Sequence, residues 1–344
     1  MPETSFYHIP PAGGLLRVAT LSEALGAAKD GGYVWLDYCE PTKEDLSPLI
    51  DQLGLHPLSI EDCLDENQIP KIEDFPHHTF LLFNAFSYSG GTLTLHEVDA
   101  FIGADFLVTV AGRDGEGRPL LGGFERTIEW EMDTVRQGPA FLLHVVLDRI
   151  VDQKFTTIEA LEEGLDAAEE AILGDLPHFE PAQLLHLRRD LLDLRKALFH
   201  EREVLVKICR RDCPFVGDKA LFYYRDIYDH LAKFFELTES SRDIVTSLME
   251  MYLSMLNNQM TKVANDTNAT VRRLTFITTI FMPLTLLAGI GGMSEWSMMT
   301  GPKHWPIAYP VFLAVLVVIG IANYSFLKWL ERKGRSRQHP TPVG

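Results

Sequence analysis

The sequence predicts an α+β domain followed by a long helical stalk and two C-terminal transmembrane helices. Strand-like and helix-like segments are mixed over residues 1–135, which is typical of an α+β domain. A helical pattern then runs almost without interruption from about Lys219 into an apolar stretch, Leu274–Met293, and a second apolar stretch follows at Ile307–Leu327. Neither stretch carries a charge, and about 20 apolar residues in a helix span a hydrocarbon core of roughly 30 Å. The C-terminal end therefore predicts a membrane protein.

The predicted elements follow one another as a domain, a stalk and a hairpin. Strands are predicted at Tyr33–Tyr38, Thr79–Tyr88 and Ala100–Val110, helices at Asp45–Gln52 and Leu58–Leu64, and further helices from Ala140 to Arg211 with a break around Gly174–Pro181. The expected boundaries are 1–135 for the α+β domain, 136–273 for the cytoplasmic helices and stalk, 274–330 for the hairpin and 331–344 for a basic tail. Within the hairpin, the first span is 274–293, the outer loop 294–306 and the second span 307–330.

Composition excludes several classes of function. A net charge of −17 argues against nucleic-acid binding, which needs clustered Lys and Arg, and fits a surface that attracts cations. Four scattered cysteines predict no disulfide framework, and no apolar signal segment opens the chain. The pair Cys209 and Cys213 lacks the further ligands of a tetrahedral zinc site. Because we find no phosphate-binding glycine loop and no nucleophile–base motif, we expect a protein that is not an enzyme.

Basic residues flank the hairpin and predict its orientation in a lipid bilayer. Arg272 and Arg273 precede the first span, and Lys328, Arg332, Lys333, Arg335 and Arg337 follow the second. The outer loop carries only Glu295, Lys303 and His304. Because loops rich in Lys and Arg stay on the cytoplasmic side, both termini are expected in the cytoplasm.

The first span indicates whether the hairpin is a plain anchor or part of an assembly. One helical stripe carries small, polar or flexible residues: Asn268, Val271, Thr275, Thr278, Met282, Thr285, Gly289 and Gly292. Uncharged oxygens along such a stripe suit a hydrated cation, whereas Gly and Thr also line close helix contacts in membranes. Asn258, Thr261 and Asn265 continue the stripe beyond the bilayer, which favours a pore axis over packing alone.

The stalk predicts self-association. Apolar residues recur in it with coiled-coil-like spacing at Leu237, Ile244, Leu248, Met251 and Met255. A helix of roughly 75 residues would be more than about 100 Å long, and such a helix is stable only when it packs against other helices or copies of itself. We therefore expect a symmetric homo-oligomer.

Three motifs resemble the CorA magnesium transporter family. They are Thr278–Ser294 (TTIFMPLTLLAGIGGMS) followed by Trp305 and Ala308–Pro310, Leu55–Asp62 followed by Pro70 and Lys71, and Tyr224–His230. The resemblance covers most of the chain. It implies an α/β sandwich whose long antiparallel helices form a homopentameric funnel with the stalk. It also implies a channel in the plasma (inner) membrane that conducts magnesium (Mg2+) into the cytoplasm down the membrane potential.

The end of the first span corresponds to the mouth of the pore in that family. The family signature Gly-Met-Asn is here Gly292, Met293 and Ser294, and the aromatic residue usual two positions before the Met is here Gly291. From this mouth the ion is expected to pass Thr285, Met282, Thr275 and Asn268.

Ser294 keeps two alternatives open, because a serine hydroxyl is shorter than an asparagine amide and can donate as well as accept a hydrogen bond. One alternative is a transporter of zinc (Zn2+), cobalt (Co2+) or nickel (Ni2+) on the same fold, as in the related ZntB branch. The other is a membrane-anchored ion sensor that does not conduct.

The resemblance further implies a regulatory site between subunits. Glu61, Asp62 and Asp226 match family positions where acidic side chains of neighbouring subunits hold a divalent cation. Carboxylates crowded across an interface repel one another unless a cation lies between them. We expect high internal Mg2+ to close the pore and its depletion to open it.

Overall fold

The computed structural model describes residues 3–65, 68–292, 298 and 301–335. The chain divides into two compact units, Met1–Tyr252 and Leu253–Gly344. The α+β domain, the long helix and the two apolar C-terminal helices expected from the sequence are all present, which confirms the predicted fold class.

A seven-stranded sheet organises the first unit, in the order β2-β1-β3-β7-β6-β5-β4. The strands are β1 (Glu3–Ile9), β2 (Leu16–Val18), β3 (Tyr33–Cys39), β4 (Lys71–Asp74), β5 (Thr79–Ser89), β6 (Thr92–Ile102) and β7 (Phe106–Ala111). Only β3 and β7 pair in parallel among the described strands. Gly90 and Gly91 both have positive φ, so they close the β5–β6 hairpin in the two-residue turn that matches strand twist.

Four short helices cover one face of this sheet. They are α1 (Leu21–Lys29), α2 (Lys43–Leu46), α3 (Pro48–Leu53) and α4 (Pro57–Leu64). Alternate strand residues such as Leu36, Leu82 and Phe101 point to them and are buried with Leu46 and Ile60. This face holds an apolar core of the unit and fixes the position of α4.

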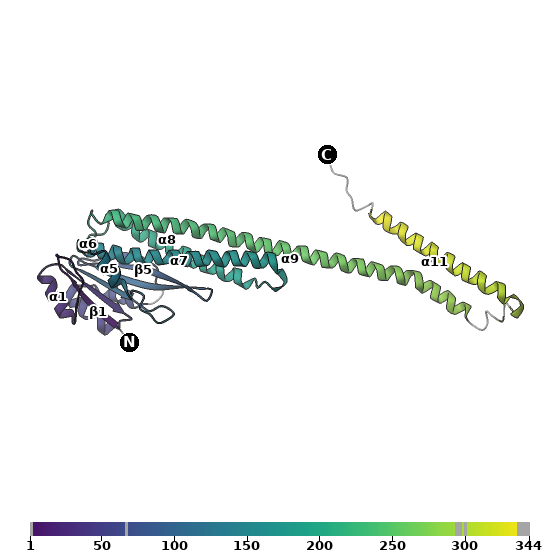
Figure 1. The fold of residues 1–344 in the computed structure, drawn as a ribbon, viewed down its shortest axis with the longest axis horizontal. Helices are drawn as coiled ribbons and strands as arrows, with labels where there is room; N and C mark the ends of the chain where they lie inside the picture. The colour runs from purple at the N-terminus through teal and green to yellow at the C-terminus, as the bar shows by residue number, and fades with distance from the viewer. Residues whose placement is uncertain (1–2, 66–67, 293–297, 299–300, 336–344) are drawn as a thin grey trace, which may run out of the picture. The chain divides into compact units, whose positions relative to one another are not determined.

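The remaining helices before the long helix belong to the opposite side of the unit. They are α5 (Phe124–Trp130), α6 (Met132–Val135), α7 (Pro139–Gly174), the short η1 (Leu176–His178) and α8 (Ala182–Cys209), and Figure 1 shows α7 running beside β5. A fully buried ion pair joins Lys154 of α7 to Glu201 of α8. Glu201 also accepts a hydrogen bond of 3.0 Å from the backbone N–H of Asn84 in β5. Two helices and one strand are thus tied together at a single point.

The long helix α9 (Leu221–Gly291) begins in the first unit, where one of its faces is buried. The buried positions recur every three or four residues: Ile227, Leu231, Phe234, Thr238, Ser241, Val245 and Leu248. The Tyr224 hydroxyl donates a 2.7 Å hydrogen bond to the carbonyl of Ala140 at the start of α7. Ile244 of the apolar stripe predicted for self-association is 44% exposed in the single chain, whereas its neighbour Val245 is buried. Contacts within the chain select this face.

The second unit contains the rest of α9, the short η2 (Pro302–His304) and α11 (Trp305–Arg335). Two described helices are long and apolar enough to cross a membrane, Leu221–Gly291 and Pro302–Trp329. In the most apolar 18-residue segment of the first helix, 6% of the residues are buried within the chain. In the corresponding segment of the second helix, 0% are buried. Such exposed apolar surface is expected of helices whose natural solvent is lipid.

Two predicted elements differ from the structure. The strand expected at Ala100–Val110 is wrong as a single element, because β6 ends at Ile102 and β7 begins at Phe106. The helix expected at Asp45–Gln52 is divided between α2 and α3, since Pro48 begins a new helix. The turns lie at residues 103–105 and at Ser47.

Candidate ion path and divalent-cation site

The polar stripe predicted in the first span is an exposed face of α9. We call it the polar face, and it comprises Asn268, Val271, Thr275, Thr278, Met282, Thr285, Gly289 and Gly292, all of them exposed. Three hydroxyls donate to the carbonyl one turn earlier: Thr275 to Val271 at 2.9 Å, Thr278 to Leu274 at 2.9 Å and Thr285 to Phe281 at 2.8 Å. Each hydroxyl hydrogen is therefore used within the helix, and its oxygen lone pairs are left as acceptors. Acceptors suit the water shell of a cation, because that water donates hydrogen bonds.

The side of α9 that lies about 100° around the helix from the polar face is covered by α11. A Cβ at Gly291 would lie 2.5 Å from Cζ of Phe312, so the Phe312 ring fills the space that a side chain at 291 would need. Two turns earlier on α9, Leu284 also lies against α11, because a Cβ at Gly320 would lie 3.5 Å from its Cδ1. Leu284 and Gly291 are seven residues apart and so share one side of the helix. The absence of the family's aromatic side chain at 291 thus has a packing reason.

A surface hollow lies on the polar face beside Pro283. It is lined by Met282, Pro283, Thr285, Leu286, Gly289 and Ile290. Proline removes one backbone donor from a helix, which loosens the turn around it. Met282, Thr285 and Gly289 therefore border a widened part of the helix surface.

The predicted mouth is described only in part. Gly292 is exposed, and its N–H donates a 3.0 Å hydrogen bond to the carbonyl of Ala288. Met293 and Ser294 lie outside the described residues.

The predicted regulatory residues are not brought together as ligands within one chain. In the part of the chain that the structure describes, no group of three or more His, Cys, Asp or Glu could hold a metal ion. Glu61 is exposed on α4, and the adjacent Asp62 accepts a 2.6 Å hydrogen bond from the Lys71 ammonium. Asp226 on α9 is 67% exposed and lies 3.8 Å from the ring of His230. A cation at Asp62 would have to compete with Lys71.

Asp148 of α7 was not predicted as a site residue, although it interacts with Asp226. Burial raises the pKa of its carboxyl to about 6, and the charges of Asp152 and Asp226 act in the same direction while His230 opposes them. Three carboxylates therefore repel one another on adjoining faces of α7 and α9. The signal in the sequence was the spacing of Asp148 and Asp152, one helical turn apart, which ordinary solvated helices also show.

Comparisons with known proteins agree with this fold. Residues 30–329 match the family described as CorA-like Mg2+ transporter protein. The chain is 34% identical over 285 residues to the cobalt/magnesium transport protein CorA of Thermotoga maritima, covering 80% of this chain and 77% of that one. It is 21% identical over 334 residues to the zinc transport protein ZntB of Yersinia enterocolitica, covering 94% and 95%.

A solved structure shows the same architecture. The complete CorA magnesium transporter from Methanocaldococcus jannaschii superposes with a TM-score of 0.68 at 22% identity, covering 94% of this chain and 96% of that one. The family match spans far more than half of the chain, and its members are membrane transporters of divalent cations rather than enzymes. The chain belongs to the CorA-like Mg2+ transporter family.

Proposed function

We propose that copies of this chain, five by resemblance to the family, assemble around the polar face of α9 and conduct hydrated Mg2+ into the cytoplasm. The observation that carries the proposal is the packing of α11 on the side of α9 that holds Leu284 and Gly291. That packing leaves the polar face open, with Thr275 and Thr285 exposed. Two apolar helices cannot enclose a path alone, so the open face needs the same face of other copies.

The chemistry of the face favours an ion that keeps its water. Mg2+ loses its hydration shell reluctantly and is usually bound through several retained waters. Threonine oxygens whose hydrogens are already donated to the helix can accept hydrogen bonds from such waters. We infer a path from Gly292, Met293 and Ser294 past Thr285, Met282 and Thr275 to Asn268.

The membrane potential supplies the driving force. A unit charge gains about 2.3 kcal/mol per 100 mV, so a divalent cation gains about 4.6 kcal/mol. The basic residues Arg272 and Lys328 at the two ends of the hairpin support cytoplasmic termini and a place in the plasma (inner) membrane.

Regulation is proposed at an interface between copies. Glu61 and Asp62 of one copy and Asp226 of the next would share a divalent cation, and Asp148 adds a carboxylate beside Asp226. Loss of the cation would leave these carboxylates repelling one another and loosen the assembly. Depletion of Mg2+ inside the cell would thereby open the pore.

Zinc transport is the second candidate. The observation that favours it is the similarity to a zinc transport protein over 94% of this chain, together with serine rather than asparagine at 294. A hydroxyl ring would be wider than an amide ring and would select less strictly for the hydrated Mg2+ ion.

Uptake into liposomes tests conduction and separates the two candidates. The purified full-length chain is reconstituted, a negative internal potential is imposed, and uptake of Mg2+, Zn2+, Co2+ and Ni2+ is followed with indicators. The proposal expects Mg2+ uptake that rises with the potential and falls strongly in Ser294→Ala, while Ser294→Asn retains or raises it. Zn2+ uptake without Mg2+ uptake would establish the second candidate. No uptake of any cation, with cation-dependent stability retained, would make the protein a sensor.

The regulatory site has its own test. Asp226→Asn and Asp148→Asn are expected to make uptake less sensitive to Mg2+ inside the liposomes. Asp243→Asn is the matched control, because it removes an exposed carboxylate of the same helix. Equal inhibition in all three variants and the wild type would remove Asp226 and Asp148 from regulation.

A further inference from the structure

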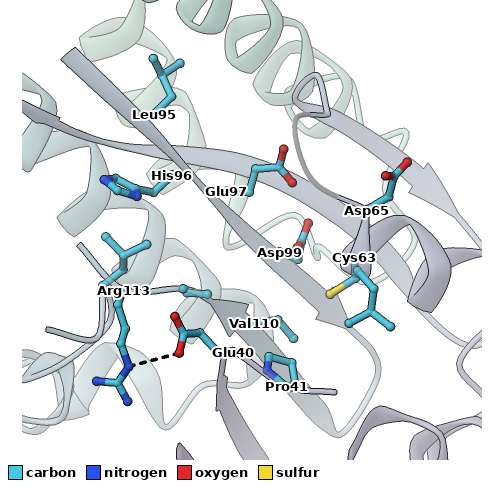
Figure 2. A pocket seen from close by; sticks show the side chains of 14 residues that line it. Glu40, Pro41, Cys63, Asp65, Leu95, His96, Glu97, Asp99, Val110 and Arg113 are labelled. Carbon is cyan, nitrogen blue, oxygen red and sulfur yellow. Dashed lines mark hydrogen bonds and ion pairs between the residues drawn. The ribbon is translucent and has the colours of Figure 1, made fainter. Parts of the chain in front are cut away.

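A pocket of about 500 Å³ lies in the first unit, between α4 and the strands β6 and β7 (Figure 2). Its polar lining is Glu40, Cys63, Asp65, His96, Glu97, Asp99 and Arg113, and its apolar lining includes Pro41, Leu64, Leu95, Val110 and Leu120. The proposed transport and regulation use none of these side chains. The volume falls in the range of roughly 300–1,000 Å³ typical of small-molecule sites.

Asp99 is the residue that the fold itself does not explain. Its side chain is on the core face of β6, between its strand partners Leu82 and Val110, and the residue is only 3% exposed. Oδ1 has no hydrogen-bond partner among the described residues. A buried carboxylate oxygen left without a donor is costly, so such an atom in a native protein calls for a ligand.

The surroundings of Asp99 add negative charge. Burial raises the pKa of its carboxyl well above the usual range, and the charges of Glu97 and Asp62 add to this, while a hydrogen bond with Cys63 and the charge of Lys71 oppose it. Glu97 is two residues away on the same face of β6 and accepts a hydrogen bond from the Gln68 N–H. A cation placed beside Asp99 and Glu97 would stabilise the ionised form of Asp99 and offset the cost of its burial.

The positive group in the pocket lining is already engaged. The pocket has four carboxylates, from Glu40, Asp65, Glu97 and Asp99, against one guanidinium, from Arg113. Arg113 Nε lies 3.3 Å from Glu40 Oε2, and Figure 2 draws this pair apart from Asp99 and Cys63. Besides the Glu40 carboxylate, which pairs with Arg113, the lining has the carboxyl groups of Asp65, Glu97 and Asp99.

The lining also indicates which kind of cation fits. A bare metal ion is disfavoured, since the described residues provide no group of three metal ligands. A compact hydrated ion would leave the walls of Leu64, Leu95 and Val110 against water. An alkylammonium ion matches both parts, because its –NH3+ group donates three hydrogen bonds and its methylene stem can lie on apolar side chains.

We propose that this pocket binds a small organic ammonium ion, with its charged end at Asp99 and Glu97 and its stem against Leu64, Leu95 and Val110. Cys63 and Leu64 belong to α4, the helix that also carries Glu61 and Asp62. A bound amine would thus link β6 to that helix. The site is separate from the ion path and does not depend on conduction.

Equilibrium dialysis of the full-length protein in detergent tests the proposal, with radiolabelled 1,4-diaminobutane as the probe. Salt of about 150 mM suppresses loose binding to the acidic surface. We expect about one bound molecule per chain, weakened about tenfold or more by Asp99→Asn and by Glu97→Gln, the loss expected for one hydrogen bond to a charged group. Glu169→Gln, which removes an exposed carboxylate outside the pocket, is the control and should bind as the wild type does.

Competition identifies the ligand class. Hexaamminecobalt(III) offers compact N–H donors without a stem, and Mg2+ offers a water shell; both should displace 1,4-diaminobutane only at about tenfold or higher concentration. Displacement at equal concentration would show a simple cation site and overturn the proposal. So would unchanged binding in both Asp99→Asn and Glu97→Gln, or no saturable binding of the diamine. Glu97 is only half-buried, so its variant decides the matter if Asp99→Asn does not fold.

Discussion

The two units of the chain treat apolar surface in opposite ways. In the first unit, α8 buries one apolar stripe inside the chain, where Leu194 is 0% exposed, while Leu185 and Phe199 on its other side are exposed. In the second, side chains of the same type are open, and Leu313 of α11 is 66% exposed. The first unit therefore has an apolar core of its own, whereas the apolar surface of the second is of the kind that lipid covers. The proposed ion path lies in the second unit, and the proposed regulatory site lies in the first.

The largest expected effect comes from breaking the buried ion pair between Lys154 and Glu201 in the first unit. Lys154→Met would leave Glu201 buried without its ammonium partner, and Glu201 Oε2 already has no hydrogen-bond partner among the described residues. Removing one member of a buried pair typically costs about 3–5 kcal/mol. Urea unfolding followed by the fluorescence of buried Trp35 measures the loss. The double variant Lys154→Met/Glu201→Leu should recover most of it, and a double variant as unstable as the single one would contradict this explanation.

A matched pair of leucine-to-alanine substitutions, one in each unit, tests the comparison between the two units. Leu194→Ala should cost about 2–5 kcal/mol, because it leaves a cavity in a packed core. Leu313→Ala should cost less than about 1 kcal/mol in a bilayer, because lipid tails are as apolar as leucine and can fill the space. Thermal unfolding of both variants in nanodiscs measures the difference. Equal losses would mean that Leu313 is packed against protein in the assembly.

A smaller effect depends on pH and concerns His78 in the first unit. His78 is 0% exposed, and its Nε2 lies 3.0 Å from the Ser59 hydroxyl. Burial lowers its pKa from 6.5 to about 4. Below pH 6.5 the unfolded chain binds the proton that the folded chain refuses, so stability is full above pH 6.5 and falls as the pH drops toward 4. The expected loss by pH 4 is about 3 kcal/mol, from roughly 1.4 kcal/mol for each of the 2.5 pKa units between 6.5 and 4.

The control for this effect is the exposed His186. His78→Gln should flatten the decline of stability between pH 6.5 and 4, and His186→Gln should leave it unchanged. Unfolding curves at several pH values measure both. A decline that persists in His78→Gln would assign it to other groups.

The sequence was most informative where a pattern was long and regular. The break between α7 and α8 and the start of α9 near Lys219 could be predicted, because helical periodicity over many turns is a strong signal. The turn between β6 and β7 was missed, because only Gly103 and Asp105 mark it between two apolar strands. Likewise, the buried face of α9 depends on which helices pack on it, which Ile244 and Val245 alone do not indicate.

The candidate site residues divide in the same way, between those that local spacing predicts and those that depend on tertiary packing. The polar face of α9 was found from local spacing, whereas Asp148 and Asp99 were missed because their significance comes from tertiary neighbours. Asp148 interacts with Asp226, 78 positions away, and Asp99 is buried beneath α4. Each is an ordinary acidic residue in the sequence, and only packing raises the pKa of its carboxyl.

The central claim is that the polar face of α9 lines an aqueous path while the rest of the span does not. Thr275 and Ile277 are two residues apart and therefore about 200° apart around the helix. The direct measurement is block of Mg2+ uptake by a positively charged, water-soluble thiol reagent in Thr275→Cys, in Ile277→Cys and in the wild type, whose own cysteines set the background. We predict rapid block in Thr275→Cys and only background block in Ile277→Cys. Equal block in both variants, or block in Ile277→Cys alone, would contradict the account.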